Sequence, residues 1–199
     1  MLDKYSYRLI EPFLTTVGKN LLKVGLTPNS LTWIGLAFCI FAAISIFYSN
    51  MLWALVFIYL NRLCDGLDGH MARQTQITKY GGFIDIFFDF IFYALIPLSF
   101  GFQREENLIP AIILLFSIFL NGISFLAFAA VKSTSKKTEE FRKKSIYYSY
   151  GLMEGTETIV FFSLFCIIPE NFSFICYIFS ALIFLTILQR LYNAQKTLK

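Results

Sequence analysis

Six long apolar segments restrict the fold of this chain more than any other feature. Each approaches or exceeds the ~20 residues that an α-helix needs to cross a bilayer. The sequence therefore predicts an all-α integral membrane protein with six transmembrane helices. These lie at about residues 31–49, 51–72, 82–101, 109–131, 153–168 and 172–192.

The composition excludes a soluble globular protein. Hydrophobic residues make up 57% of the 199 residues and only 15% are charged, so a soluble domain of this length would expose a large apolar surface. The six segments predict one helical bundle over 26–199. No cleavable signal peptide is expected, because the first 25 residues carry six charged side chains and no long apolar run.

The N-terminal segment, residues 1–25, has a different character. Its apolar residues recur at helical spacing between charged ones, which is typical of an amphipathic helix lying in the membrane interface. The alternative is a solvated helix packed against the bundle. Pro28 is expected to end this helix, and Asn29 or Ser30 to cap the next one.

Lysine and arginine are distributed very unequally between the two sides of the predicted bundle. The N-terminal segment, residues 62–79, the 132–150 loop and the tail carry four, three, six and three of the 17, and the opposite side holds only Arg104. The positive-inside rule then places both termini on the cytoplasmic side of a cell membrane. The four cysteines form no metal-binding or redox pattern.

Four aspartates lie within 25 residues of this apolar chain: Asp65, Asp68, Asp85 and Asp89. Ionisable residues in membrane segments are rare and usually functional. On one helix, Asp65 and Asp68 share a face with Gly69 and Ala72; on the next, Asp85 and Asp89 share a face with Gly81. Two antiparallel helices joined by the polar segment 74–80 would bring the four carboxylates to one point. The small residues would let backbones or a ligand approach closely.

An all-oxygen ligand set favours Mg²⁺, Mn²⁺ or Ca²⁺ over Zn²⁺. Two such ions can clamp a diphosphate, a neighbouring carboxylate can take a proton from an attacking hydroxyl, and Arg73 can bind phosphate through its planar guanidinium. The alternative is a buried ion-pair network. It would need about four cations at matching depth, and the spans supply only Arg62 and Arg73.

Eight of these positions resemble the signature of the CDP-alcohol phosphatidyltransferase family, D-x2-D-G-x2-A-R followed by G-x3-D-x3-D. Every fixed position is filled, by Asp65, Asp68, Gly69, Ala72, Arg73, Gly81, Asp85 and Asp89. The six spans and the interfacial helix are also similar to the family's architecture.

The resemblance implies transfer of a substituted phosphate from a CDP-linked lipid to a small alcohol, with release of CMP. The four aspartates would hold two Mg²⁺ or Mn²⁺ ions, and Asp89 would also accept the proton. Gly69, Arg73 and Thr78 would line the nucleotide and diphosphate beside Ala72 and Gly81, and Asn29 to Thr32 would lie near the cytidine. The resemblance also implies a homodimer; no nucleic-acid partner is expected.

The acceptor is left open. Many family members that use phosphorylated acceptors have Arg directly after the last motif aspartate, where this chain has Phe90. Lys132, Glu154 and Glu157 are the acceptor-binding candidates. The alternatives are that the 132–150 loop is only a positive-inside flank and that the two glutamates only favour a helix N-terminus. His70 is expected to line the site without binding metal.

We expect a phospholipid-synthesis transferase that uses CDP-diacylglycerol. The first alternative is transfer of a phospho-amino-alcohol from a soluble CDP-alcohol to diacylglycerol. A cation transporter is a remote alternative, because the acids cluster toward one face rather than across the membrane depth.

Overall fold

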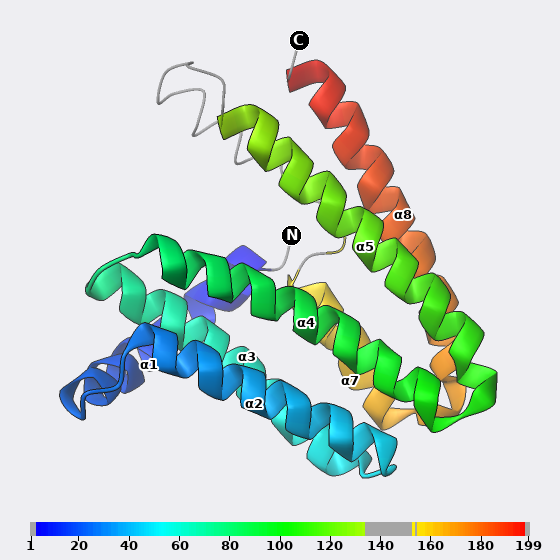
Figure 1. Ribbon diagram of the computed structural model, residues 1–199, viewed down its shortest axis with the longest axis horizontal. Helices are drawn as coiled ribbons and strands as arrows, with labels where there is room; N and C mark the ends of the chain where they lie inside the picture. The colour runs from blue at the N-terminus through cyan, green and yellow to red at the C-terminus, as the bar shows by residue number, and fades with distance from the viewer. Residues whose placement is uncertain (1–2, 134–152, 154, 198–199) are drawn as a thin grey trace.

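All regular structure in the described residues, 3–133, 153 and 155–197, is helical. The protein is represented by a computed structural model (Figure 1). The elements are α1 (Asp3–Lys23), α2 (Pro28–Phe47), α3 (Met51–Gln74), α4 (Lys79–Gln103), α5 (Glu105–Ser133), α7 (Gly155–Ile167), the 3₁₀ turn η1 (Pro169–Asn171) and α8 (Phe172–Thr197).

A helix lies at each of the six predicted spans, but among the residues that the structure describes only four helices are both long and apolar enough to cross a membrane. These are α2, α4, α5 and α8 with η1. α3 has 24 residues, yet the charged end of this helix lowers its hydropathy. α7 has 13 residues, which is short for a crossing. The prediction of an all-helical membrane protein is confirmed, and the count of six spans stays a prediction.

The predicted boundaries around Pro28 were wrong. Thr27, not Asn29 or Ser30, caps α2, since its hydroxyl accepts a hydrogen bond from the Ser30 amide at 3.2 Å and Pro28 takes the first helical position. α1 ends at Lys23, before Pro28, and Gly25 follows it with a φ of 83° that suits glycine. The Leu26 amide bonds back to the Leu21 carbonyl at 3.1 Å, which closes the helix as a Schellman motif.

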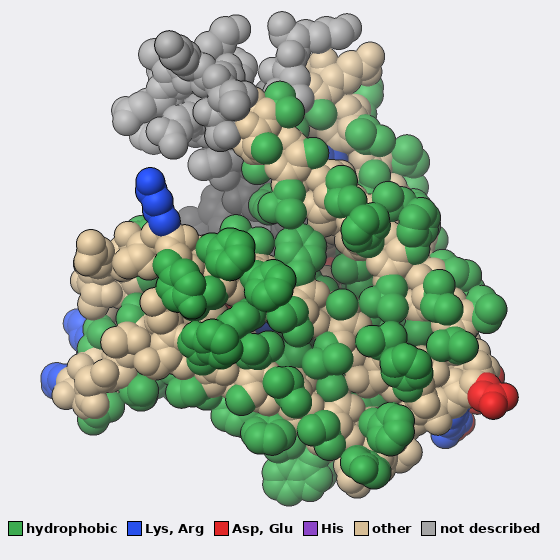
Figure 2. Space-filling model, viewed as in Figure 1, with side chains coloured by type: hydrophobic (Ala, Val, Ile, Leu, Met, Phe, Trp, Pro, Cys, Tyr) green, Lys and Arg blue, Asp and Glu red, His purple; other side chains and the backbone are tan. Residues whose placement is uncertain are grey.

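The helices form a bundle in which α2 packs along both α3 and α4, while α5 packs on α4 and α8 (Figure 1). Buried phenylalanines make the core between α4, α7 and α8; the Phe100 and Phe172 rings stack with centroids 4.8 Å apart. Apolar side chains also cover most of the face seen in Figure 2, with charged groups at its edges. A continuous apolar perimeter is what a bundle immersed in lipid requires.

The α4–α5 turn is tied to the connection between α7 and α8. Arg104 donates two hydrogen bonds to the Glu170 carboxylate, at 2.7 and 2.9 Å. Gln103 donates to the Ser49 hydroxyl at 2.9 Å, which joins the same turn to the α2–α3 loop. Three connections are thus held together at one end of the bundle.

α1 docks against α3 beside the aspartates. Leu14 is 1% exposed and lies over Gly66. The Thr15 hydroxyl hydrogen-bonds the His70 ring at 3.2 Å, so His70 joins the two helices instead of lining the site as expected. Ile10 and Phe13 remain exposed on α1, which leaves an apolar surface for the predicted membrane interface.

Candidate metal centre

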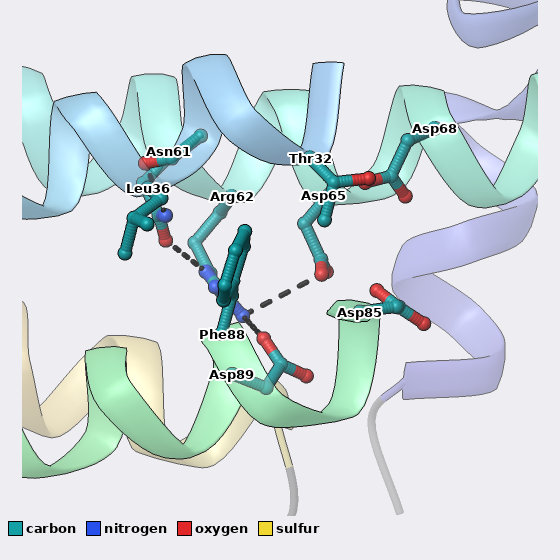
Figure 3. Close-up of a pocket in the computed structure, with 10 residues that line it drawn as sticks. Thr32, Leu36, Asn61, Arg62, Asp65, Asp68, Asp85, Phe88 and Asp89 are labelled. Atoms are coloured by element: carbon teal, nitrogen blue, oxygen red, sulfur yellow. Dashed lines mark hydrogen bonds and ion pairs between the residues drawn. The ribbon is translucent and has the colours of Figure 1, made fainter. Parts of the chain in front are cut away.

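The four aspartates lie in the space between α3 and α4 (Figure 3). α3 carries Asp65 and Asp68, and α4 carries Asp85 and Asp89. One carboxylate oxygen from each of Asp65, Asp68 and Asp85 lies within 4.8 Å of the others, a group able to hold a metal ion. Helical spacing therefore correctly predicted a shared point for these three side chains.

Asp89 joins the group through an arginine. Arg62 Nη1 donates to Asp89 Oδ1 at 2.9 Å and lies 3.7 Å from Asp65 Oδ2, so the guanidinium bridges a carboxylate of each helix (Figure 3). The ion-pair alternative is thus realised for one arginine and two of the acids.

α2 supplies the polar surroundings of the site, although it carries no acid. Thr32 donates a 2.6 Å hydrogen bond to Asp68, which is only 4% exposed. The Gly35 carbonyl accepts from Asn61, and Asn61 in turn accepts from Arg62 Nε at 2.7 Å. The resulting pocket is lined by Thr32, Gly35, Leu36, Asn61, Arg62, Asp65, Asp68, Asp85, Phe88 and Asp89.

The motif glycines do not bring α3 and α4 backbones together. These helices have few close approaches, whereas α2 packs along both. A side chain at Gly69 would meet the guanidinium of Arg73 on its own helix, at 3.4 Å. One at Gly81 would lie 3.0 Å from the Asn29 amide oxygen. Close approach of a ligand at these glycines stays a prediction.

Three predicted substrate residues gather at the start of α4. Thr78 caps this helix by accepting from the Gly81 amide at 2.9 Å, and Asn29 reaches the same point from the first turn of α2. Ala72 is half-buried and Arg73 exposed in the last turns of α3. The predicted set therefore forms a rim at the end of the helix pair where the acids lie.

The acceptor candidates are placed less completely. Glu157 is half-buried in the first turn of α7. Glu154, the Lys132 side chain and most of the 132–150 loop lie outside the described residues.

Sequence reasoning missed the roles of Arg62 and Asn61. Arg62 lies three residues before Asp65, so helical spacing already placed it on the acidic face. From the sequence, Arg62 is expected only as one cation of an ion-pair network. Asn61 gave no signal, because its link to Gly35 depends on how α2 packs.

A sequence model described as CDP-alcohol phosphatidyltransferase matches residues 25–188, most of the chain. The chain belongs to this family. The transferase therefore transfers substituted phosphate groups in phospholipid synthesis with the help of divalent metal, and the hard oxygen ligands of the aspartate cluster suit that metal.

The chain is also similar to two curated relatives. The transferase is 42% identical to the inner membrane protein YnjF of Escherichia coli over 100% of its own length and 98% of the relative's. An archaetidylinositol phosphate synthase of Pyrococcus horikoshii is 36% identical over 86 residues, covering 43% of this chain and 45% of that one.

Solved structures share the fold. The phosphatidylinositol phosphate synthase of Mycobacterium tuberculosis with CDP-DAG bound aligns with a TM-score of 0.72 at 19% identity, over 91% of this chain and 92% of that chain. The same protein has been solved with manganese and citrate, and aligns with a TM-score of 0.66 at 19% identity, over 92% and 88% of the two chains.

Proposed function

We propose that the transferase moves a phosphatidyl group from CDP-diacylglycerol to the hydroxyl of a small alcohol and releases CMP. The observation that carries this proposal is the cluster of Asp65, Asp68 and Asp85 oxygens within 4.8 Å of one another at one end of a membrane bundle. A water-soluble acceptor and a lipid donor can meet at that level. CDP-DAG in the M. tuberculosis relative supports the choice of donor.

The aspartates would divide the chemistry. Asp65, Asp68, Asp85 and Asp89 would hold two Mg²⁺ or Mn²⁺ ions, which when bound offset the charge of the diphosphate during in-line displacement. Asp89 would take the proton of the acceptor hydroxyl. The acceptor oxygen would bond to the lipid-linked phosphorus as the bond from that phosphorus to the CMP oxygen breaks.

The rim around the aspartates would bind the donor nucleotide. Asn29 and Thr32 would lie near the cytidine, and Gly69, Ala72, Arg73, Thr78 and Gly81 near the diphosphate. The absence of a side chain at Gly81 supports this, since a Cβ there would crowd both Thr78 and Asn29. Thr32 would act partly through Asp68, whose carboxylate it already bonds.

The remaining assignments concern the whole protein. Six helices would cross the membrane, and both termini and the site would face the cytoplasm. The acceptor would be bound by Lys132, Glu154 and Glu157. Two copies of the chain would form a homodimer. Arg73 and Lys79 flank the acidic end of the helix pair, which supports a cytoplasmic site.

The decisive experiment is to incubate purified protein with CDP-diacylglycerol, Mn²⁺ or Mg²⁺ and separate alcohols, and to follow CMP. The panel should include glycerol 3-phosphate, an inositol phosphate, free inositol and serine. Metal-dependent CMP release with one acceptor is expected, and chelation should abolish it. Product formed from a soluble CDP-amino-alcohol and diacylglycerol, with none from CDP-diacylglycerol, would overturn the choice of donor.

A further inference from the structure

Arg62 lies between the two acidic helices and is built firmly into the bundle. Its side chain is 11% exposed, and Nη1 is 2.9 Å from the Asp89 carboxylate. The guanidinium carbon lies 4.0 Å from the centroid of the Phe92 ring, which is fully buried. Such a cation–π contact fixes the plane of the guanidinium.

A second hydrogen bond fixes the other side of the guanidinium. Arg62 Nε donates to Asn61 Oδ1 at 2.7 Å, and Asn61 donates its own amide to the Gly35 carbonyl at 2.8 Å. The arginine is therefore held by α3, α2 and α4 together. A surface salt bridge would show none of these supports.

The four aspartates are consequently divided. Asp65, Asp68 and Asp85 form the close group of carboxylates, whereas Asp89 accepts the hydrogen bond of Arg62, whose Nη1 lies farther, 3.7 Å, from Asp65. An ion bound by the first three would meet Arg62 only at Asp65, which lies 3.7 Å from Nη1, and would leave the closer Arg62–Asp89 hydrogen bond in place. An ion that also uses Asp89 would need this hydrogen bond to open, because like charges a few ångströms apart repel strongly.

We propose that Arg62 is a resident counter-ion of Asp89: it positions this carboxylate before metal binds and competes with a divalent ion for it. The proposal rests on the proposed role of Asp89 as a metal ligand. It predicts that the two ions bind with unequal affinity, the weaker one being that which displaces Arg62. Arg62 thereby sets the divalent-ion concentration at which the site becomes complete.

The test is direct measurement of Mn²⁺ binding without substrate, for the full chain and for Arg62→Gln, Arg62→Lys and Arg104→Gln. Calorimetry gives the two affinities, and electron paramagnetic resonance detects the spin coupling of two nearby Mn²⁺ ions. In Arg62→Gln, the spin-coupled Mn²⁺ pair should form at a Mn²⁺ concentration at least about tenfold lower than in the unaltered chain. The reason is that the charge competing with the ion for Asp89 is gone. Arg62→Lys should lie between Arg62→Gln and the unaltered chain.

Arg104→Gln is the matched control, since Arg104 bonds Glu170 at the other end of the bundle and should leave both Mn²⁺ affinities unchanged. A second affinity that stays the same or falls in Arg62→Gln would overturn the proposal. If Arg62→Gln does not yield a monodisperse protein, Arg62→Met decides, because methionine also removes the charge and keeps a long apolar side chain. An unaltered second affinity in Arg62→Met would then overturn the proposal.

The two proposals fail separately. A protein that binds Mn²⁺ as expected but releases no CMP with any acceptor refutes the proposed function and leaves the counter-ion role standing. An active protein whose second Mn²⁺ affinity is independent of residue 62 refutes the role of Arg62 alone.

Discussion

Asp68 and Asp89 are held in opposite ways, although both belong to the same quartet. Asp68 is 4% exposed and accepts from the neutral hydroxyl of Thr32, while Asp89 pairs with the cationic Arg62. A neutral donor orients a carboxylate without competing for its charge, but a guanidinium does compete. The sequence shows the two as equivalent acids at motif positions, and only their neighbours from α2 and α3 distinguish them.

Asp89→Asn should abolish turnover. The amide cannot accept the hydroxyl proton, and loss of a positioned general base typically lowers the rate about 10²- to 10⁴-fold. CMP release measures this, and Mn²⁺ binding by Asp65, Asp68 and Asp85 should persist. Near-normal CMP release would show that another group is the base.

Thr32→Val should weaken metal binding. Valine keeps the shape of threonine but removes the 2.6 Å hydrogen bond that orients Asp68. Loss of a group that orients a metal ligand commonly lowers affinity about 10- to 100-fold. Mn²⁺ titration measures the effect. Thr16→Val is the matched control, since the Thr16 hydroxyl donates to the Pro12 carbonyl of its own helix. An equal loss of Mn²⁺ affinity in both variants would contradict the role of Thr32.

At the scale of elements, α2 is the scaffold for the site. It packs along α3 and α4, and it brings Asn29, Thr32 and Gly35 to the acidic pair. Its sequence reads as an ordinary apolar span, with a mean hydropathy of 2.1. The helical period of 3.6 residues predicted which faces of α3 and α4 carry the acids. It did not predict that α2 completes the polar contacts of these faces.

α4 is held from its other side by a close contact with α5. The Phe90 ring packs directly against Gly122, so a Cβ at position 122 would overlap the ring. Phe90 follows Asp89 in the chain, and its packing therefore fixes the part of α4 that carries Asp89. At this position the chain has a half-buried aromatic ring packed on Gly122 and no cation to bind an acceptor.

Gly122→Ala should lower thermal stability in detergent, because overpacking of a core contact typically costs about 1–3 kcal/mol. A melting curve followed by size-exclusion chromatography measures the change. Gly82→Ala is the control: it lies in the first turn of α4 with nothing within 4 Å of an added Cβ. A melting temperature for Gly122→Ala equal to that of Gly82→Ala would show that α4 and α5 can separate without loss.

At the scale of the molecule, the two ends of the bundle differ in charge and in bonding. At one end Arg104 pairs with Glu170 and three connections are tied together. At the other, Lys23, Arg73 and Lys79 flank the aspartates. The apolar face between these ends, seen in Figure 2, fits a bilayer.

The orientation can be tested by labelling. With the four natural cysteines replaced by serine, a single cysteine at Glu105 should react with a membrane-impermeant maleimide added outside intact cells. One at Thr75, in the turn between α3 and α4, should react only after lysis, because the positive-inside rule places this turn in the cytoplasm. The opposite pattern would reverse the proposed orientation.

The sequence alone determined the class of fold, the family and the quartet of aspartates, because hydropathy, helical period and motif spacing are local properties. It could not determine which carboxylates are paired, since that depends on contacts between residues 26 to 36 positions apart: Thr32 with Asp68, Gly35 with Asn61 and Arg62 with Asp89. The strength of the interaction between two charges depends on their distance in space and not on their separation in the sequence. The tertiary structure therefore decided that three aspartates gather within 4.8 Å of one another and that the fourth accepts a hydrogen bond from Arg62.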